Sequence, residues 1–500
     1  MSYPTAVTLS AEEIRQPEKL IILHTNDVHS QIDPHEDGTG GLLRRKAVID
    51  SVRAEHPNVI LIDAGDAVQG SMYFTLYKGE VEYKMMDLLD YDIAVLGNHD
   101  FDNGMEQLAR VLPLANATWL TSNYDLRGST LEPYFKPYEI RTVGDKKIGF
   151  IGINLEPKGM IAEGNYDGVV YLDATEAANA MAWYLKNVEH ADYVVAVTHI
   201  GYDGTYRASD ASIAKDSKNI DLIIGGHSHT VIDPENQTER YRARHANASC
   251  DSITIAQSGG KGAYVGEIEI DLATLATKSK LIKVDGRLDS RIDKKFEAQL
   301  LPYSHAVDSI MAVKVGKTAH KLSRDENELL NFLGDFVKKK GEELSGKKID
   351  LSVINRGGVR SDLPKGKITK GMVIDMLPFN NRVEVLEIKG SDLKDAIDVV
   401  VKRGAKDGIN SEARIAYDKD EKIATNVTFD GKELDPNAIY RVATIDYLAN
   451  GGDYMEPLTR GTVVASSDQV LYDDLLDYIQ KHFKKTYISA TQESRYKASK

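Results

Sequence analysis

The stretch "LIILHTNDVHSQ", Leu20 to Gln31, joins a short apolar run to an acid and a histidine two positions apart. The apolar run has the length and composition of a buried strand. Residues i and i+2 of a strand point to the same side, so we expect Asp27 and His29 to reach one point at its carboxyl end. That is metal-ligand geometry, although an isolated Asp-x-His triplet is more often a turn acid beside a surface histidine.

Four later apolar runs also end in polar or metal-ligating side chains. They alternate with amphipathic helical stretches, which is typical of an α/β domain, and open α/β sheets place their sites at the carboxyl ends of the strands. Buried polar residues satisfied by caps and turns would explain any two of these strand ends, but explain all five poorly. The additional candidates are Asp66 in "DAGD", Asn98 and His99 in "GNHD", His199 in "VTHIG", and His227 and His229 in "GGHSHT".

The chemistry of this set indicates the kind of metal. Carboxylate, amide and imidazole ligands without a thiolate suit Zn, Mn, Fe or Co better than Ca or Mg. The set is too large for one tetrahedral ion. Two divalent ions that share a carboxylate, about 3.5–4 Å apart, would use all of it.

Length, charge and cysteine content narrow the class of protein. A chain of 500 residues predicts two or three domains. Its formal net charge of −14 argues against a nucleic-acid polymer or an anionic membrane as partner, so local cations must hold any anionic substrate. The single Cys250 excludes an intrachain disulfide. No apolar run approaches the roughly 18 residues of a membrane span.

The chain divides into two predicted domains. The first covers residues 20–290, and residues 291–312 form a helical connector whose periodicity is interrupted by Pro302. The second covers residues 313–487 and contains the helical stretch 326–344. The polar tail 489–500 is expected to be disordered. The first twenty residues lack a basic region followed by an apolar one, which leaves a cytoplasmic location open.

The motifs "DVH", "GDAVQGS", "GNHDFD", "THIG" and "GGHSH", in this order and spacing, resemble those of the calcineurin-like metallophosphoesterases, in particular their 5′-nucleotidase branch. The resemblance spans most of residues 20–270. It implies a four-layer αββα sandwich, joined by the helical connector to a smaller α/β C-terminal domain. It implies one metal held by Asp27, His29, Asp66 and His229, and a second held by Asp66, Asn98, His199 and His227.

The resemblance also assigns a catalytic dyad to "NHDFD". His99 would stabilise charge on the phosphoryl group or leaving oxygen together with Asn98, and Asp102 would orient the imidazole ring. An alternative for Asp102 is an N-terminal cap on the helix that follows. Asp63 is interpreted as a supporting or structural residue.

The second domain supplies candidate cations. In "NRGGVRSDLP", Arg356 and Arg360 flank two glycines, and guanidinium groups suit bidentate contact with a phosphate. An arginine pair in a loop is otherwise usually surface charge. The segments "INRGGVRSDLPKGKIT", "MLPFNNRVEVLEIKGSDL" and "TIDYLANGGDYM" resemble the 5′-nucleotidase C-terminal domain. That resemblance implies substrate contacts for Arg356, Arg360 and Arg403, with Asn380 as a further candidate.

The sequence departs from the family pattern at the positions that hold the nucleotide base. Family members that hydrolyse nucleotides hold it between two aromatic rings. Here the segment "AKDGINSEARIAYD" lacks the expected phenylalanine, and "NGGDYM" places Tyr454 or Met455 near the second position. A base could still stack on Tyr454, but a two-sided clamp is not predicted.

The leading hypothesis is a two-metal phosphomonoesterase that acts on nucleoside 5′-monophosphates. One alternative keeps the metals but takes nucleotide-diphosphate sugars, cyclic nucleotides or non-nucleotide phosphates. Another is a binding protein that keeps a metal site without turnover. The resemblance further implies rotation between the domains near Pro302 and a periplasmic or cell-surface location. The sequence does not indicate an oligomeric state.

Overall fold

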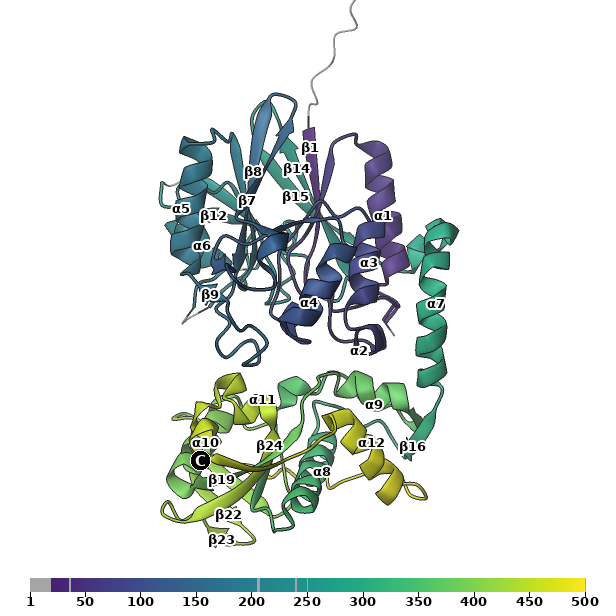
Figure 1. Cartoon of the computed structure of the whole chain (residues 1–500), viewed down its shortest axis with the longest axis vertical. Helices are drawn as coiled ribbons and strands as arrows, with labels where there is room; N and C mark the ends of the chain where they lie inside the picture. Colours follow the sequence, from purple (N-terminus) through teal and green to yellow (C-terminus); the bar gives the residue numbers. More distant parts are fainter. Residues whose placement is uncertain (1–18, 36, 205–206, 239–240, 250, 500) are drawn as a thin grey trace, which may run out of the picture.

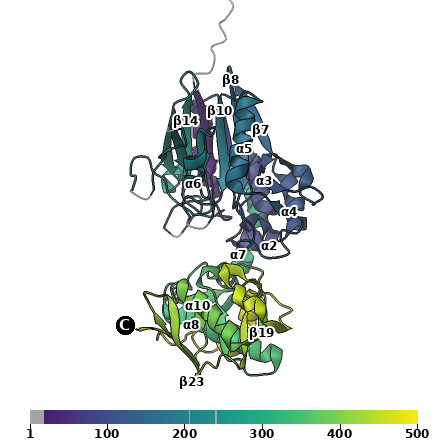
Figure 2. The same cartoon turned by 90° about the vertical axis from the view of Figure 1, so that its left-hand side faces the viewer.

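The computed structural model describes residues 19–499 apart from 36, 205–206, 239–240 and 250. Cys250 and most of the N-terminal stretch considered above lie outside the described residues. The chain forms two bodies stacked along the long axis of the molecule, with one long helix running down one side between them (Figures 1 and 2). No helix within the described ranges is long and apolar enough to cross a membrane.

The N-terminal body contains two large mixed β-sheets. The first has the strand order β15-β14-β1-β2-β3-β4-β6, and the second has the order β12-β13-β11-β10-β8-β7. The bounds in the first sheet are β15 Thr277–Lys283, β14 Tyr264–Asp271, β1 Lys19–Thr25, β2 Val59–Asp63, β3 Ile93–Ala94, β4 Thr118–Leu120 and β6 Phe135–Lys136. Those in the second are β12 Arg244–Ala246, β13 Ser252–Ala256, β11 Leu222–Ile224, β10 Tyr193–His199, β8 Lys146–Asn154 and β7 Tyr138–Val143.

Side-chain alternation along β1 builds both faces of the first sheet. Leu20 and Ile22 pack in a cluster with Phe150 and Val195 of the second sheet, so the two sheets face each other. Ile21 and Leu23 point the other way, into a cluster with residues of the outer helices. All four of these β1 side chains are at most 1% exposed, and burial of each contributes about 1.5–3 kcal/mol.

Helices cover both outer faces, which completes the predicted four-layer αββα sandwich. The first sheet is covered by α1 (Leu42–Glu55), α2 (Met72–Tyr77), α3 (Glu80–Leu88) and α4 (Met105–Val111). The second is covered by α5 (Ala174–Asn187) and α6 (Asp210–Asp216), and a small pair, β5 (Tyr124–Asp125) with β9 (Val170–Tyr171), lies outside the large sheets. The fold class expected from the sequence is confirmed for this body.

The connector is a single helix, α7 (Lys294–Met311), with Pro302 inside it. Phe296, Leu300 and Val307 belong to the outer cluster of the first sheet, so α7 packs along the N-terminal body before it reaches the second one. The expectation that Pro302 interrupts the helix was wrong, because burial of this apolar stripe outweighs the backbone hydrogen bond that proline removes.

The C-terminal body is a smaller α/β unit. Its five-stranded sheet has the order β20 (Gly408–Ile409), β17 (Leu351–Ile354), β24 (Ile439–Ile445), β19 (Val383–Lys389) and β25 (Thr462–Ser466). A four-stranded sheet contains β23 (Lys432–Glu433), β22 (Ile423–Phe429), β21 (Ala413–Asp418) and β26 (Tyr496–Ser499), and β16 (Lys314–Thr318) pairs with β18 (Gly366–Thr369). Its helices are α8 (Asn327–Ser345), α9 (Lys370–Met376), α10 (Gly390–Lys402), α11 (Asp446–Ala449) and α12 (Leu471–His482).

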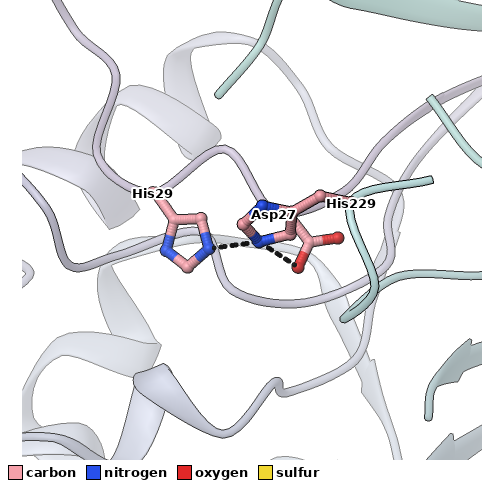
Figure 3. A group of neighbouring side chains, drawn as sticks. All are labelled: Asp27, His29 and His229. Atoms are coloured by element: carbon pink, nitrogen blue, oxygen red, sulfur yellow. Dashed lines mark hydrogen bonds and ion pairs between the residues drawn. The ribbon is translucent and has the colours of Figure 1, made fainter. Parts of the chain in front are cut away.

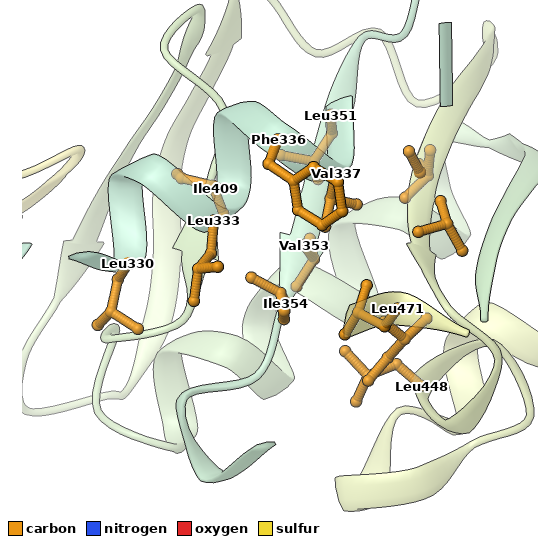
Figure 4. Packing of buried hydrophobic residues seen from close by; sticks show 14 of the residues in the cluster. Leu330, Leu333, Phe336, Val337, Leu351, Val353, Ile354, Ile409, Leu448 and Leu471 are labelled. Atoms are coloured by element: carbon orange, nitrogen blue, oxygen red, sulfur yellow. The ribbon is translucent and has the colours of Figure 1, made fainter. Parts of the chain in front are cut away.

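The core of this body lies between α8 and the central strands. Phe336 and Val337 of α8 pack against Leu351 and Val353 of β17 (Figure 4). The C-terminal tail was expected to be disordered, and this was wrong. Its residues form β26, which pairs in parallel with β21, because Arg495 is buried and makes a bidentate pair with Asp335 of α8 at 2.9 and 2.7 Å.

Candidate metal centre and interdomain site

The loop that follows β1 positions the first two candidate ligands. The strand ends at Thr25, and both Asp27 and His29 have left-handed backbone conformations, with φ of 50° and 49°. Asn26 fixes the loop, because its Nδ2 donates to the carbonyl of Gly259 at 2.6 Å and its Oδ1 accepts from the backbone N–H of Ser258 at 2.8 Å. The two side chains therefore converge through a turn, and the expected strand alternation was the wrong reason.

Asp27, His29 and His229 form the first cluster of candidate ligands (Figure 3). The Nε2 atoms of His29 and His229 are 2.9 Å apart, and Nε2 of His229 lies 3.4 Å from Oδ1 of Asp27. Burial holds the pKa of His29 well below its ordinary value, so this imidazole is neutral. A neutral imidazole has a free lone pair for a metal ion.

Asp66, His199 and His227 form the second cluster. Oδ2 of Asp66 lies 3.2 Å from Nε2 of His199 and 3.7 Å from Nε2 of His29, so this carboxylate stands between the two clusters. The amide oxygen of Asn98 lies 3.0 Å from Nδ1 of His227. The ligands come from the carboxyl ends of β1, β2 and β3 in one sheet, and of β10 and β11 in the other.

The surroundings of His199 fit a ligand. Its Nδ1 donates to the carbonyl of Ala64 at 2.7 Å, which leaves Nε2 directed towards Asp66. Burial lowers the pKa of His199, but the charge of Asp66 outweighs it and raises the pKa to about 10. Nε2 of His199 is buried and has no hydrogen-bond partner among the described residues. The negative charge of Asp66, which favours a proton on His199, also attracts a divalent cation to the same place. The residues therefore fit the predicted metals.

Glycines allow the two clusters to approach each other. A Cβ added at Gly97 would lie 2.1 Å from Oδ1 of Asp66. A Cβ at Gly226 would lie 2.5 Å from the carbonyl of Ala64 and 2.8 Å from Nδ1 of His199. Any side chain at these two positions would therefore displace a candidate ligand.

His99 and Asp102 are paired beside the first cluster. Nδ1 of His99 lies 3.0 Å from Oδ2 of Asp102, and the backbone N–H of His99 donates to Oδ1 of Asp66 at 2.8 Å. Asp102 does not cap the following helix, since α4 is preceded by Gly104 at the capping position, so the capping alternative was wrong. Burial lowers the pKa of His99, but the charges of Asp102 and Asp66 outweigh it, and the net shift is upward.

Asp63 takes part in the support of β1. Its Oδ2 accepts a hydrogen bond from Oγ1 of Thr25 at 2.6 Å, and its Oδ1 accepts from the backbone N–H of Gly65 at 3.1 Å. Burial raises its pKa to about 7. These contacts agree with its interpretation as a structural residue.

The arginines of the C-terminal body differ in their surroundings. Arg360 lies near the metal clusters, since its guanidinium stands over the ring of Phe379, which contacts His99. Burial, and then the charge of Arg324, lower the pKa of Arg360, and the charges of Asp66 and Asp102 offset only part of this shift. Arg356 forms an ion pair with Asp325. Arg403 is bonded to Asp407 and to the backbone carbonyl of Asp453.

Two further candidates lie at the edge of this region. Nδ2 of Asn380 donates to Oδ1 of Asn103 at 2.9 Å, so it joins the two bodies directly. Tyr454 is 56% exposed.

Sequence reasoning missed two aromatic residues. The centre of the Phe379 ring lies 5.7 Å from that of the His99 imidazole, at an interplanar angle of 30°. The guanidinium of Arg360 stands over the same Phe379 ring, 5.7 Å from its centre. Tyr447 bonds Oδ1 of Asp453 at 3.2 Å, and burial first, then the charges of Asp453 and Asp102, raise its pKa. The signal was present, because Phe379 lies inside "MLPFNN" and Tyr447 inside "TIDYLANGGDYM".

Comparisons with known proteins cover both bodies. The family model described as calcineurin-like phosphoesterase matches residues 20–231, and the one described as 5′-nucleotidase, C-terminal domain, matches residues 309–460. Snake venom 5′-nucleotidase of Naja atra is 29% identical, over 93% of this chain and 96% of its own. The 5′-nucleotidase of Vibrio cholerae is 28% identical, over 92% of this chain and 90% of its own. The crystal structure of a 5′-nucleotidase precursor from Thermus thermophilus superposes with a TM-score of 0.82 at 27% identity, over 96% of this chain and 99% of the other.

An αββα sandwich with these carboxylate, amide and imidazole clusters at the ends of its strands defines a metal-dependent phosphoesterase of the calcineurin-like class. The second matched domain narrows this class. The chain belongs to the 5′-nucleotidase family.

Proposed function

We propose that this protein is a phosphomonoesterase that hydrolyses nucleoside 5′-monophosphates to nucleoside and phosphate. The observation that supports it most is that metal-ligating side chains of one body lie close to an arginine of the other. Two clusters of metal-ligating side chains lie in the N-terminal body, and Arg360 of the C-terminal body stands over the ring of Phe379, which contacts His99 beside these clusters. A phosphoryl group bound between them would meet positive charge from both sides.

In this proposal the first ion is held by Asp27, His29, Asp66 and His229, and the second by Asp66, Asn98, His199 and His227. Two such ions, when bound, lower the pKa of a water molecule and shield the negative charge of the phosphoryl group. Zn, Mn, Fe or Co would suit the donors. The position of Asp66 between the clusters supports its role as the shared carboxylate.

The chain's own residues supply the remaining steps. His99, held as an imidazolium by Asp102, donates a hydrogen bond to the phosphoryl or leaving oxygen, where charge develops. Arg360 holds the phosphate, and Arg356 and Arg403 contribute further contacts. Phe379 covers His99 from the second body and limits the access of water. Phe379 and Arg360 belong to the second body, and they lie beside His99 only while the two bodies are in contact. We also propose that the bodies separate and close again by rotation about α7.

A single experiment tests the centre of this proposal. Metal content is measured by mass spectrometry on purified protein, and phosphate release from AMP is followed before and after treatment with a chelator. We expect about two divalent ions per chain, loss of turnover on chelation, and recovery on addition of Zn or Mn. Full activity in metal-free protein would contradict the mechanism.

The second candidate is a broader phosphoesterase that accepts nucleotide-diphosphate sugars, cyclic nucleotides or non-nucleotide phosphates. The segment "AKDGINSEARIAYD" favours it, because it lacks the phenylalanine that one side of an aromatic clamp for the base would need. A panel of these substrates compared with AMP distinguishes the two. If sugar phosphates turn over as fast as AMP, the broader activity is correct. The resemblance to the family favours a periplasmic or cell-surface location, which cell fractionation tests.

A further inference from the structure

One buried carboxylate, that of Asp407, holds two of the arginines assigned to substrate. Asp407 is only 7% exposed. Its Oδ1 accepts a hydrogen bond from the backbone N–H of Arg356 at 3.1 Å, and its Oδ2 pairs with Nη2 of Arg403. Arg356 begins the turn after β17, whereas Arg403 follows the end of α10. A single side chain thus fixes two separate segments of the proposed substrate site.

The guanidinium of Arg403 is also fixed from its other side. Its Nη1 donates to the backbone carbonyl of Asp453 at 2.7 Å. The carboxylate of Asp453 accepts from Nδ2 of Asn355 at 2.6 Å, and Asn355 directly precedes Arg356. With both terminal nitrogens engaged, the direction of the Arg403 fork is set before any ligand arrives, which reduces the entropy lost on binding.

The backbone of Asp407 is held by the far end of the chain. The hydroxyl of Tyr496 donates to the carbonyl of Asp407 at 2.9 Å. Tyr496 is the first residue of β26, which is paired with β21. The neighbouring Arg495 is 3% exposed, forms the bidentate pair with Asp335 and donates to the carbonyl of Ile409. The short connection between α10 and β20, which contains Asp407, is therefore clamped by the C-terminal strand.

We propose that Asp407 is a positioning residue for substrate binding, and that the C-terminal strand, through Tyr496, holds it in place. This inference rests on the proposed function, because it takes Arg403 and Arg356 as substrate contacts. Asp407 is bonded to Arg356, Arg403 and Tyr496, and none of its hydrogen bonds within the described part of the chain reaches a candidate metal ligand or the His99–Asp102 pair. Its loss should therefore weaken substrate binding and leave the chemical step and the metal content unchanged.

The test is a double-mutant cycle on the metal-loaded, full-length protein with AMP as substrate. Asp407→Asn, Arg403→Ala and the double variant are compared by KM, kcat and metal content. We expect Asp407→Asn to raise KM about tenfold, with kcat within about twofold and full metal content. Because Asp407 acts in part through Arg403, Asp407→Asn should raise KM less in the Arg403→Ala background than in the parent, and the remaining effect reports its bond to Arg356. Fully additive effects would overturn the inference.

Failure of this inference is distinguishable from failure of the proposed function. If Arg403→Ala raises KM and Asp407→Asn does not, only the positioning role falls. If Arg403→Ala leaves KM unchanged, the assignment of Arg403 to substrate falls as well. Asp395→Asn is the matched control, since Asp395 also pairs with an arginine, Arg460, at 2.8 Å, but on the exposed side of α10. It should leave KM unchanged.

Tyr496→Phe tests the part played by the C-terminal strand, because it removes one hydroxyl and keeps the ring. We expect a rise in KM about threefold, smaller than that of Asp407→Asn, since the carboxylate stays and only its backbone anchor is lost. Thermal unfolding is measured in parallel to show that the variant is folded. An unchanged KM in folded Tyr496→Phe would overturn the role of the strand.

Discussion

His99 is the residue at which the two bodies and the metal clusters meet. Its ring contacts Asp102 through Nδ1 and Phe379 through its face, and its backbone supports Asp66. We expect His99→Gln to lower kcat for AMP by about 10² to 10³, because one preorganised donor is lost at the position where charge develops. Metal content should stay at the level of the parent, since the backbone bond to Asp66 remains. Equal kcat in variant and parent would contradict the assigned role.

A second residue-scale prediction concerns Asp375 in α9. Burial, and then the charge of Asp33 in the N-terminal body, raise its pKa from 3.8 to about 7. Between these two values the folded protein keeps a proton that the unfolded chain has lost. The stability associated with this group is therefore present below pH 3.8 and is lost as the pH rises towards about 7.

The substitution Asp375→Asn removes this titration. The parent loses stability as the pH rises, and the variant does not. The free energy of unfolding of the variant minus that of the parent should therefore increase from about pH 5 to about pH 8. Denaturant unfolding of both proteins at the two pH values measures the change, with the exposed Asp395→Asn as control. A difference between variant and parent that is the same at both pH values would show that Asp375 is not a buried neutral acid.

At the scale of elements, most of the fold and most of the candidate metal ligands could be predicted from the apolar runs and the polar residues that follow them. The runs at β1, β2, β10 and β11 are nearly continuous in apolar residues, and such a pattern has few other interpretations. The reason that Asp27 and His29 converge was not predictable, because the left-handed turn after Thr25 depends on Asn26 and its partners 232 and 233 residues away.

The same limit applies wherever a distant contact decides local structure. The tail looks polar and disordered, but the buried Arg495 pairs with Asp335, 160 residues away, and β26 lies beside that pair. Phe379 looks like an ordinary core residue until the second body places its ring on His99. A motif such as "MLPFNN" can mark a residue as interesting, but it does not show which distant side chain that residue contacts, since both contacts depend on the assembled fold.

The loop after β3 yields an element-scale prediction. We expect Gly97→Ala to disturb the shared carboxylate, because the new Cβ would lie 2.1 Å from Oδ1 of Asp66 and 2.5 Å from its backbone nitrogen. Bound metal should fall below the parent value and AMP turnover should fall with it. Gly286→Ala is the control, as its nearest contact is 3.6 Å and its φ is not left-handed. Full metal content in folded Gly97→Ala would contradict this account of the centre.

At the scale of the whole molecule, the two bodies are in contact at His99 and beside Asp102, the proposed catalytic dyad. Phe379 covers His99, and Asn380 is bonded to Asn103, the residue next to Asp102. In the proposed mechanism, a substrate that binds between Arg360 and the metal clusters enters when these contacts are broken. Outside this region α9 of the C-terminal body packs against both α7 and α2. Because α7 is the covalent link between the bodies, it is the element about which the proposed separation would occur.

A reversible crosslink tests this requirement. Asn103→Cys and Asn380→Cys are combined in a Cys250→Ser background, since these two side chains are already 2.9 Å apart and Cys250 is the only natural thiol. We expect the oxidised protein to lose turnover of AMP and to regain it in reductant, while each single variant is insensitive to oxidation. Because the metals and the dyad are intact in the crosslinked form, the loss would measure the need for opening alone. Full turnover with the disulfide in place would mean that nucleotide and phosphate exchange without separation of the bodies, and rotation about α7 would then have no part in the catalytic cycle.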